Sequence, residues 1–310
     1  MIQNSSSVGQ QFLANLQLLQ QQMARTQEQV SSGYQINQPS DDPGELGDVL
    51  QLESDLGQVT QVASNLTSVS SEVNTAESAL ENATQLLEQA GSLAAQGASS
   101  TVSASERTGL SQQVSQILSE LVSSANTNFE GQYVFSGDET SSPPYQLDSS
   151  STTGVDELVT APAPRLIQDA TGITFAVSLT AQQIFDARDS TGAPDANNVF
   201  LAVNSLATAL ANDDQTGITA AISSIQTAQT YLGQQLQFYG SVQDQITNAT
   251  SVAQKFQLQD QTSLGQLRDT NMASASVALT QEQTTDQAAI QAEAAMPKTS
   301  LFDYIDSATS

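Results

Sequence analysis

The sequence contains no cysteine, no histidine and no tryptophan, and aromatic residues make up only 5% of the chain. The missing cysteine excludes disulfide bonds and thiolate catalysis. The missing histidine excludes imidazole acid–base catalysis, and the two absences together exclude zinc sites built on these residues. The scarcity of aromatic residues disfavours a large globular core. The chain of 310 residues therefore allows two domains, or one elongated domain with an insertion.

Basic residues are also scarce, with seven Lys and Arg against 33 Asp and Glu and a net charge of −26. No basic patch can then neutralise phosphates, so we expect no nucleic-acid partner. No run of eighteen apolar residues exists, and we expect no membrane insertion. The first residues have neither the basic nor the apolar region of a secretory signal, which predicts a cytoplasmic chain or export without a cleaved signal peptide.

Proline is absent from two long stretches of the chain. It occurs at 39 and 43, then only between 143 and 194, and finally at 297, so two proline-free arms flank a turn-rich centre. In the first arm, apolar residues recur in a 4-3 alternation from Leu52 to Ala94, which is typical of a coiled-coil seam. The second arm has a similar pattern from Ile218 to Phe256. We therefore predict two long helices packed antiparallel, each roughly 80 Å long at 1.5 Å per residue.

Capping residues mark the helix boundaries. Asp42 is a predicted N-cap, Pro43 stands where its missing N–H costs nothing, and Glu45 has the spacing to reach back to the cap. These three residues predict the start of the first long helix. Ser103 and Glu106 have the spacing of a second capping box, behind which a shorter helix is expected to fold back.

The centre of the chain changes its period. Residues from Ile173 to Leu179 alternate between large apolar and small side chains, which predicts a half-buried strand. Tyr133–Phe135 and Arg165–Ile167 are further predicted strands. The predicted fold class is mainly α with a β insertion: an elongated antiparallel α-helical coiled-coil rod carrying a small β domain. We expect terminal helices in 1–41 and 268–310, the rod in 42–131 and 196–267, and the inserted β domain in 132–195.

Both ends carry predicted helices that cannot stand alone. Five apolar side chains mark one stripe of residues 8–30, and their burial contributes on the order of 10 kcal/mol. Ordering about 25 residues costs roughly 1–2 kcal/mol each. We therefore expect the ends to be disordered in the monomer and to order on assembly. The predicted assembly interface comprises Phe12, Leu16, Leu19, Met23, Val30, Met272, Leu279, Ile290, Leu301, Phe302, Tyr304 and Ile305.

Two adjacent acid pairs, Asp41–Asp42 and Asp213–Asp214, are candidates for a cation site or a catalytic dyad. Acidic residues are, however, favoured in first helical turns, and the long seams leave little chain for a pocket. We therefore predict capping and turn roles for these acids. The prediction for the chain is no enzymatic activity, no catalytic residue, no metal site and no cofactor.

The N-terminal part resembles a known family. The stretch Gln27–Asn37, with the sequence QEQVSSGYQIN, is followed by Asp41-Asp42-Pro43 and resembles the N-terminal signature of bacterial flagellins and their relatives. The departure is Tyr34-Gln35, where the family usually has two basic residues.

Other motifs extend the resemblance. Residues 271–273, 279–283 and 300–305 resemble the family's terminal helix and end. Residues 128–137 with Pro143-Pro144-Tyr145 are similar to one branch of the family, hook-associated protein 3, which joins the flagellar hook to the filament.

The resemblance implies more than the patterns do. Members of the family leave the cell unfolded through the flagellar type III export channel, and their terminal helices form the inner tube of the assembly. It implies an extracellular structural protein of the flagellar hook–filament junction. The implied partners are hook-associated protein 1, flagellin, lateral copies of the chain itself and an export chaperone. Two alternatives remain: a filament-forming flagellin, and an extracellular coiled-coil adhesin or translocator-like protein.

Overall fold

The structure, a computed structural model, describes residues 2–160 and 163–295. The chain divides into two compact units, one formed by residues 58–257 and the other by residues 1–57 with 258–310. Helices α2 (Leu46–Gly97) and α6 (Gln215–Arg268) each begin in one unit and end in the other. Among the described residues, no helix is both long enough and apolar enough to span a bilayer.

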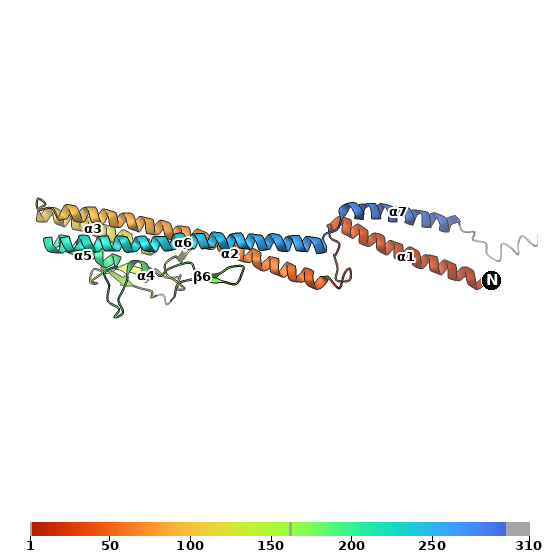
Figure 1. The fold of residues 1–310 in the computed structure, drawn as a ribbon, viewed down its shortest axis with the longest axis horizontal. Coiled ribbons are helices and arrows are strands. Elements are labelled where there is room, and N and C mark those ends of the chain that lie inside the picture. The colour runs from red at the N-terminus through yellow and green to blue at the C-terminus, as the bar shows by residue number, and fades with distance from the viewer. Residues whose placement is uncertain (1, 161–162, 296–310) are drawn as a thin grey trace, which may run out of the picture. The chain divides into compact units, whose positions relative to one another are not determined.

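In the unit of residues 58–257, α2 and α6 pack antiparallel (Figure 1). Gln243 donates to Ser70 Oγ over 2.9 Å and Gln257 donates to Thr60 Oγ1 over 3.4 Å, so positions advance on one helix as they recede on the other. Buried positions recur every seven residues on both helices, as coiled-coil packing requires. They are Leu66, Val73, Leu80, Leu87 and Ala94 on α2, and Ile218, Ile225, Leu232, Tyr239, Ile246 and Ala253 on α6. The predicted seam and its antiparallel partner are confirmed.

Two shorter helices complete this bundle. Helix α3 (Ala104–Ala125) packs along α5 (Val199–Ala211), and both contribute to the same apolar core as α2 and α6. The predicted capping box of α3 is present, because Ser103 Oγ accepts from Glu106 N–H and the Glu106 carboxylate accepts from Ser103 N–H over 2.7 Å. This reciprocal cap satisfies two of the donors that a helix N-terminus leaves free.

The start of α2 differs from the prediction. The regular helix begins at Leu46, not at Pro43, and residues 42–45 form a hydrogen-bonded turn. Asp42 Oδ1 accepts from Gly44 N–H over 2.9 Å and from Glu45 N–H over 3.2 Å, as an N-cap oxygen does. Gly44 and Gly47 disfavour helix by roughly 1 kcal/mol each relative to alanine, which accounts for the later start.

In the described part of the centre, the strands form three separate antiparallel hairpins. These are β1 (Asn128–Phe129) with β2 (Gln132–Tyr133), β3 (Tyr145–Leu147) with β4 (Val155–Glu157), and β5 (Leu166–Gln168) with β6 (Thr174–Ala176). The fold is thus mainly α with a small β insertion, as predicted. The strand predicted at 173–179 shortens to β6, because β5 is its one neighbour and their pairing ends at Leu166 and Ala176.

The strand predicted at Tyr133–Phe135 is wrong beyond Tyr133. Val134 and Phe135 lie in a buried turn rather than in a strand. The Phe135 ring packs edge-on against Phe185 of the short helix α4 (Ala181–Phe185) at 5.7 Å, and against Tyr239 of α6 at 6.2 Å. Burial against helices, rather than strand pairing, explains why this segment is apolar.

The other unit contains α1 (Ile2–Ser32), α7 (Met272–Ala295), the first turns of α2 and the last turns of α6. Helices α1 and α7 lie along each other (Figure 1). A small core of Ile36, Val49 and Leu264 joins the connecting segment 33–45 to α2 and α6.

Candidate assembly interface

The α1–α7 pair exposes much of its apolar surface. The five predicted residues on α1, which are Phe12, Leu16, Leu19, Met23 and Val30, are only half-buried. Leu13 and Leu18 are 52% and 62% exposed. A two-helix pair has too little interior to bury side chains on all sides of each helix. The apolar residues of α1 therefore have a partly filled seam on one side and water on the other.

Helix α7 exposes three of its large apolar residues. Val277 is 67% exposed, and the predicted interface residues Met272 and Ile290 are 46% and 48% exposed. Leu279 is half-buried, whereas Ala275 is buried. The predicted residues Leu301, Phe302, Tyr304 and Ile305 lie outside the described residues. These exposed apolar side chains make α7 a candidate interaction surface.

Two carboxylates occupy the side of α7 that packs on α1. Thr26 is buried, and its hydroxyl donates to Glu282 Oε1 over 3.2 Å. Glu282 Oε2 and Asp286 Oδ1 are both buried without a hydrogen-bond partner among the described residues. Burying an unpaired carboxylate oxygen is costly. These two oxygens therefore add no hydrogen bond to the seam between α1 and α7.

The connections at the base of this pair are tied together. Gln35 N–H donates to Arg268 O over 2.6 Å, and Thr270 N–H donates to Gly33 O over 2.9 Å, across an antiparallel bridge between Tyr34 and Asp269. The Arg268 guanidinium lies 4.0 Å from the centre of the Tyr34 ring. We call residues 33–35 and 268–270 the clasp. Arg268 thus places a positive charge beside Tyr34, one of the two positions where this sequence departs from the family's basic pair.

Both acid pairs serve local roles in the structure. Asp41 Oδ2 accepts from Asn37 N–H and Gln38 N–H over 3.0 and 2.8 Å, beside the turn that Asp42 caps. Asp213 has a positive φ of 56° and forms an ion pair with Arg107. In the described ranges, no three acidic residues converge as metal ligands would.

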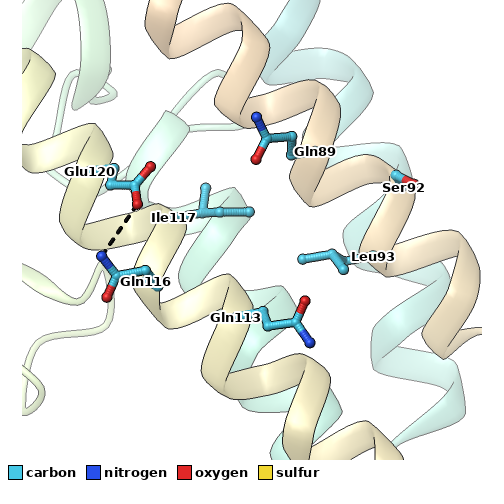
Figure 2. A pocket seen from close by; sticks show the side chains of 7 residues that line it. All are labelled: Gln89, Ser92, Leu93, Gln113, Gln116, Ile117 and Glu120. Atoms are coloured by element: carbon cyan, nitrogen blue, oxygen red, sulfur yellow. Dashed lines mark hydrogen bonds between the residues drawn. The ribbon is translucent and has the colours of Figure 1, made fainter.

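A groove lies between α2 and α3 in the helical bundle (Figure 2). It has a volume of about 350 Å³ and is lined by Gln89, Ser92, Leu93, Gln113, Gln116, Ile117 and Glu120. Its one ionisable lining group, Glu120, accepts from Gln116 Nε2 over 3.3 Å. The other polar lining groups are three side-chain amides and the hydroxyl of Ser92.

A buried polar network stabilises the hairpin region. Asp186 is fully buried and accepts from Asn198 Nδ2 over 2.6 Å and from Arg188 Nε over 2.9 Å. Arg188 also lies 3.2 Å from Glu157. Burial raises the pKa of Glu157 above its ordinary value, and the nearby Arg188 opposes that rise. The tyrosine hydroxyl of Tyr145 donates to Asp186 over 3.3 Å and closes the network.

Comparison with known proteins identifies the N-terminal part of the chain. Residues 4–140 match the model of the bacterial flagellin N-terminal helical region. This part of the chain is a flagellin-type helical region. The resemblance predicted from residues 27–43 is confirmed, and the flagellin-type region includes α1, α2 and α3. No curated protein matches the chain.

Solved structures match the fold over most of the chain. A putative flagellar hook-associated protein from Vibrio parahaemolyticus matches with a TM-score of 0.64 at 20% identity, covering 74% of this chain and 100% of that one. Flagellar hook associated protein-3 from Legionella pneumophila matches with a TM-score of 0.62 at 14% identity, covering 71% and 98%. FlgL of Bacillus cereus matches with a TM-score of 0.54 at 15% identity, covering 71% and 100%. At these identities the likeness concerns the fold.

Proposed function

We propose that this chain is a structural component of the bacterial flagellum and joins the hook to the flagellin filament. The observation that carries the proposal is a flagellin-type helical region whose first helix, α1, leaves Leu13 and Leu18 exposed beside an incompletely filled seam. A surface of this kind is completed by neighbouring subunits in a lattice. The three solved structures named above are hook-associated or FlgL proteins, so we prefer the junction role to a filament-forming flagellin or an adhesin.

The proposal assigns a role to each part of the chain. Residues 1–41 and 268–310 pack into the inner tube, residues 42–131 and 196–267 form the rod around it, and residues 132–195 face outward. Hook-associated protein 1 lies below, flagellin adds above, and lateral copies of the chain pack alongside. The export chaperone covers the apolar end of the chain before secretion through the flagellar export channel. In this role the chain catalyses no reaction.

The proposal also includes a disorder-to-order step in the terminal helices. Half-buried apolar residues and two unpaired carboxylate oxygens make the α1–α7 pair marginal in the free chain. We expect amides of residues 8–30 to exchange much faster than those of α3 in the dilute chain. They gain protection in the assembly. Equal protection of α1 and α3 in the dilute monomer contradicts this step.

Co-sedimentation with isolated hooks that end in hook-associated protein 1 tests the assignment. The interface variant carries Leu18→Ser with Val277→Ser, which removes two exposed apolar side chains from α1 and α7. The matched control carries Leu166→Ser, since Leu166 is 61% exposed on hairpin strand β5. We expect the unmodified chain and the control to sediment with hooks and the interface variant to stay in solution. Equal binding of all three chains refutes the proposed interface.

A further inference from the structure

The clasp contains both backbone hydrogen bonds and side-chain contacts between its two segments. Two backbone hydrogen bonds cross between residues 33–35 and residues 268–270, at 2.6 and 2.9 Å. A pairing of two such short segments has little stability of its own in water. The side chain of Arg268 supplies the additional contacts. Its guanidinium lies over the Tyr34 ring and donates from Nη1 to Glu53 Oε1 over 2.9 Å.

Arg268 is also one of few positive charges available for such a role. The chain has seven Lys and Arg in all. Arg268 pairs with Glu53 and lies 3.7 Å from Asp269, so acidic groups on α2 and in the connection hold its guanidinium against the ring. A cation held over an aromatic face is attracted by the ring electrons. Because Arg268 ends α6 and Tyr34 follows α1, this contact joins the two connecting segments of the chain.

The position of the clasp determines which helices it couples. Residues 33–35 directly follow α1, and residues 268–270 run from the last residue of α6 toward α7, which begins at Met272. Gly33 has a φ of +79°, a conformation that glycine adopts without strain and that turns the chain away from α1. Fixing one connecting segment to the other therefore fixes the base of α1 to the base of α7. The seam above this base contains Glu282 and Asp286, each with one buried oxygen that lacks a partner.

We propose that the clasp is a coupling joint, which keeps the bases of α1 and α7 together so that the two helices reorient and dock as one body. The inference rests on the proposed function for its use: a protein that joins two different lattices has to place its terminal helices in two surroundings. The geometry of the joint, however, belongs to the free chain. It can be tested without any hook or filament.

The test measures distances between two spin labels in the free, full-length chain. The sequence has no cysteine, so Gln27→Cys on α1 and Gln281→Cys on α7, both exposed positions, give one specific pair. Double electron–electron resonance on this pair measures the distance between the two labels near the base of the two helices. Residues 27 and 281 lie near the clasp, which restricts their spacing even while the rest of α1 and α7 opens, so in the otherwise unmodified chain we expect one distance distribution that is narrower than in variants without the clasp.

Four variants then separate the joint from its surroundings. Arg268→Ala and Tyr34→Ala each remove the cation–ring contact, and we expect either one to make the distribution roughly twice as wide. Tyr34→Phe keeps the ring face and is expected to leave the distribution narrow. Lys255→Gln removes one positive charge from the same helix, α6, outside the clasp, and is the matched control. A distribution that stays narrow in both alanine variants, or that widens equally in the control, overturns the proposal.

Hook binding provides the second readout. If the joint exists and the junction role is correct, Arg268→Ala widens the distance distribution and also weakens co-sedimentation with hooks. If the distribution widens but no form of the chain binds hooks, the coupling joint stands and the junction role fails. If hooks bind the unmodified chain and Arg268→Ala equally well while the distribution stays narrow, the junction role stands and the joint is refuted.

Discussion

Arg107 offers a quantitative test of how the helical bundle is closed at one end. Its side chain is buried, with Nε donating to Gly97 O over 2.8 Å and Nη2 donating to Ser99 O over 3.1 Å. The same guanidinium reaches Gln215 Oε1 over 2.6 Å and pairs with Asp213. One side chain thus joins the turn after α2 to the turn before α6.

The expected cost of Arg107→Met follows from these contacts. The substitution keeps most of the side-chain volume but leaves Gly97 O, a carbonyl at the end of α2, without its side-chain donor. An unsatisfied buried acceptor costs about 1–3 kcal/mol, and further bonds from a charged donor are lost at Ser99 and Gln215. Asp213 is 48% exposed, so water compensates much of the lost ion pair. We expect the unfolding free energy to fall by about 3 kcal/mol.

Urea denaturation followed by circular dichroism measures this change, with two companion variants. Arg107→Lys keeps the charge but lacks the planar fork that reaches several acceptors, and is expected to lose about half as much. Asp213→Asn keeps a residue type that tolerates the positive φ of 56°, and is expected to cost less than about 1 kcal/mol. The reasoning is refuted if Arg107→Met costs less than about 0.5 kcal/mol, or no more than Asp213→Asn.

Three further predictions concern charge. Glu282→Gln with Asp286→Asn removes the charge from two carboxylates that each have one buried oxygen without a partner, so hydrogen exchange of α1 amides should slow by about tenfold; unchanged or faster exchange contradicts this. The chain has a net charge of −26, so its acidic groups repel one another in the folded state. Because salt screens this repulsion, the midpoint of urea denaturation should rise between about 0.01 and 1 M NaCl, and a midpoint that falls with added salt contradicts the prediction. Because the raised pKa of Glu157 makes the folded state bind its proton more tightly, acidification from pH 7 toward 4.5 should stabilise the unmodified chain relative to Glu157→Gln in thermal melts; identical pH responses disprove it.

The helices were predictable because their signal is local and repeated. Buried positions such as Leu66, Leu80 and Leu87 stand seven or fourteen residues apart, and each repeat adds to the same conclusion. The capping box of α3 was equally readable, since Ser103 and Glu106 are three residues apart and interact directly. The hairpins were less predictable. Strands of two or three residues carry too few positions for a period of two to emerge.

The contacts of the candidate interface join residues that are far apart in the sequence, so no local sequence pattern predicts them. Tyr34 and Arg268 meet only because the two connecting segments cross, and they are far apart in the sequence. Glu282 and Asp286 look like ordinary solvent-facing acids of a polar helix, yet each has a buried oxygen. The role of Arg107 could have been suspected from the sequence. A cation in the first turn of a helix interacts unfavourably with the helix macrodipole, so its presence indicates a compensating contact elsewhere.

The most direct test of the account is electron microscopy of hooks capped by hook-associated protein 1, incubated with the purified chain and then with flagellin. The account predicts a short terminal zone of added protein, from which flagellin filaments grow. Long filaments formed by the chain alone would show that it is a filament flagellin. Hooks left bare, with no filament growth after flagellin is added, would contradict the junction role itself.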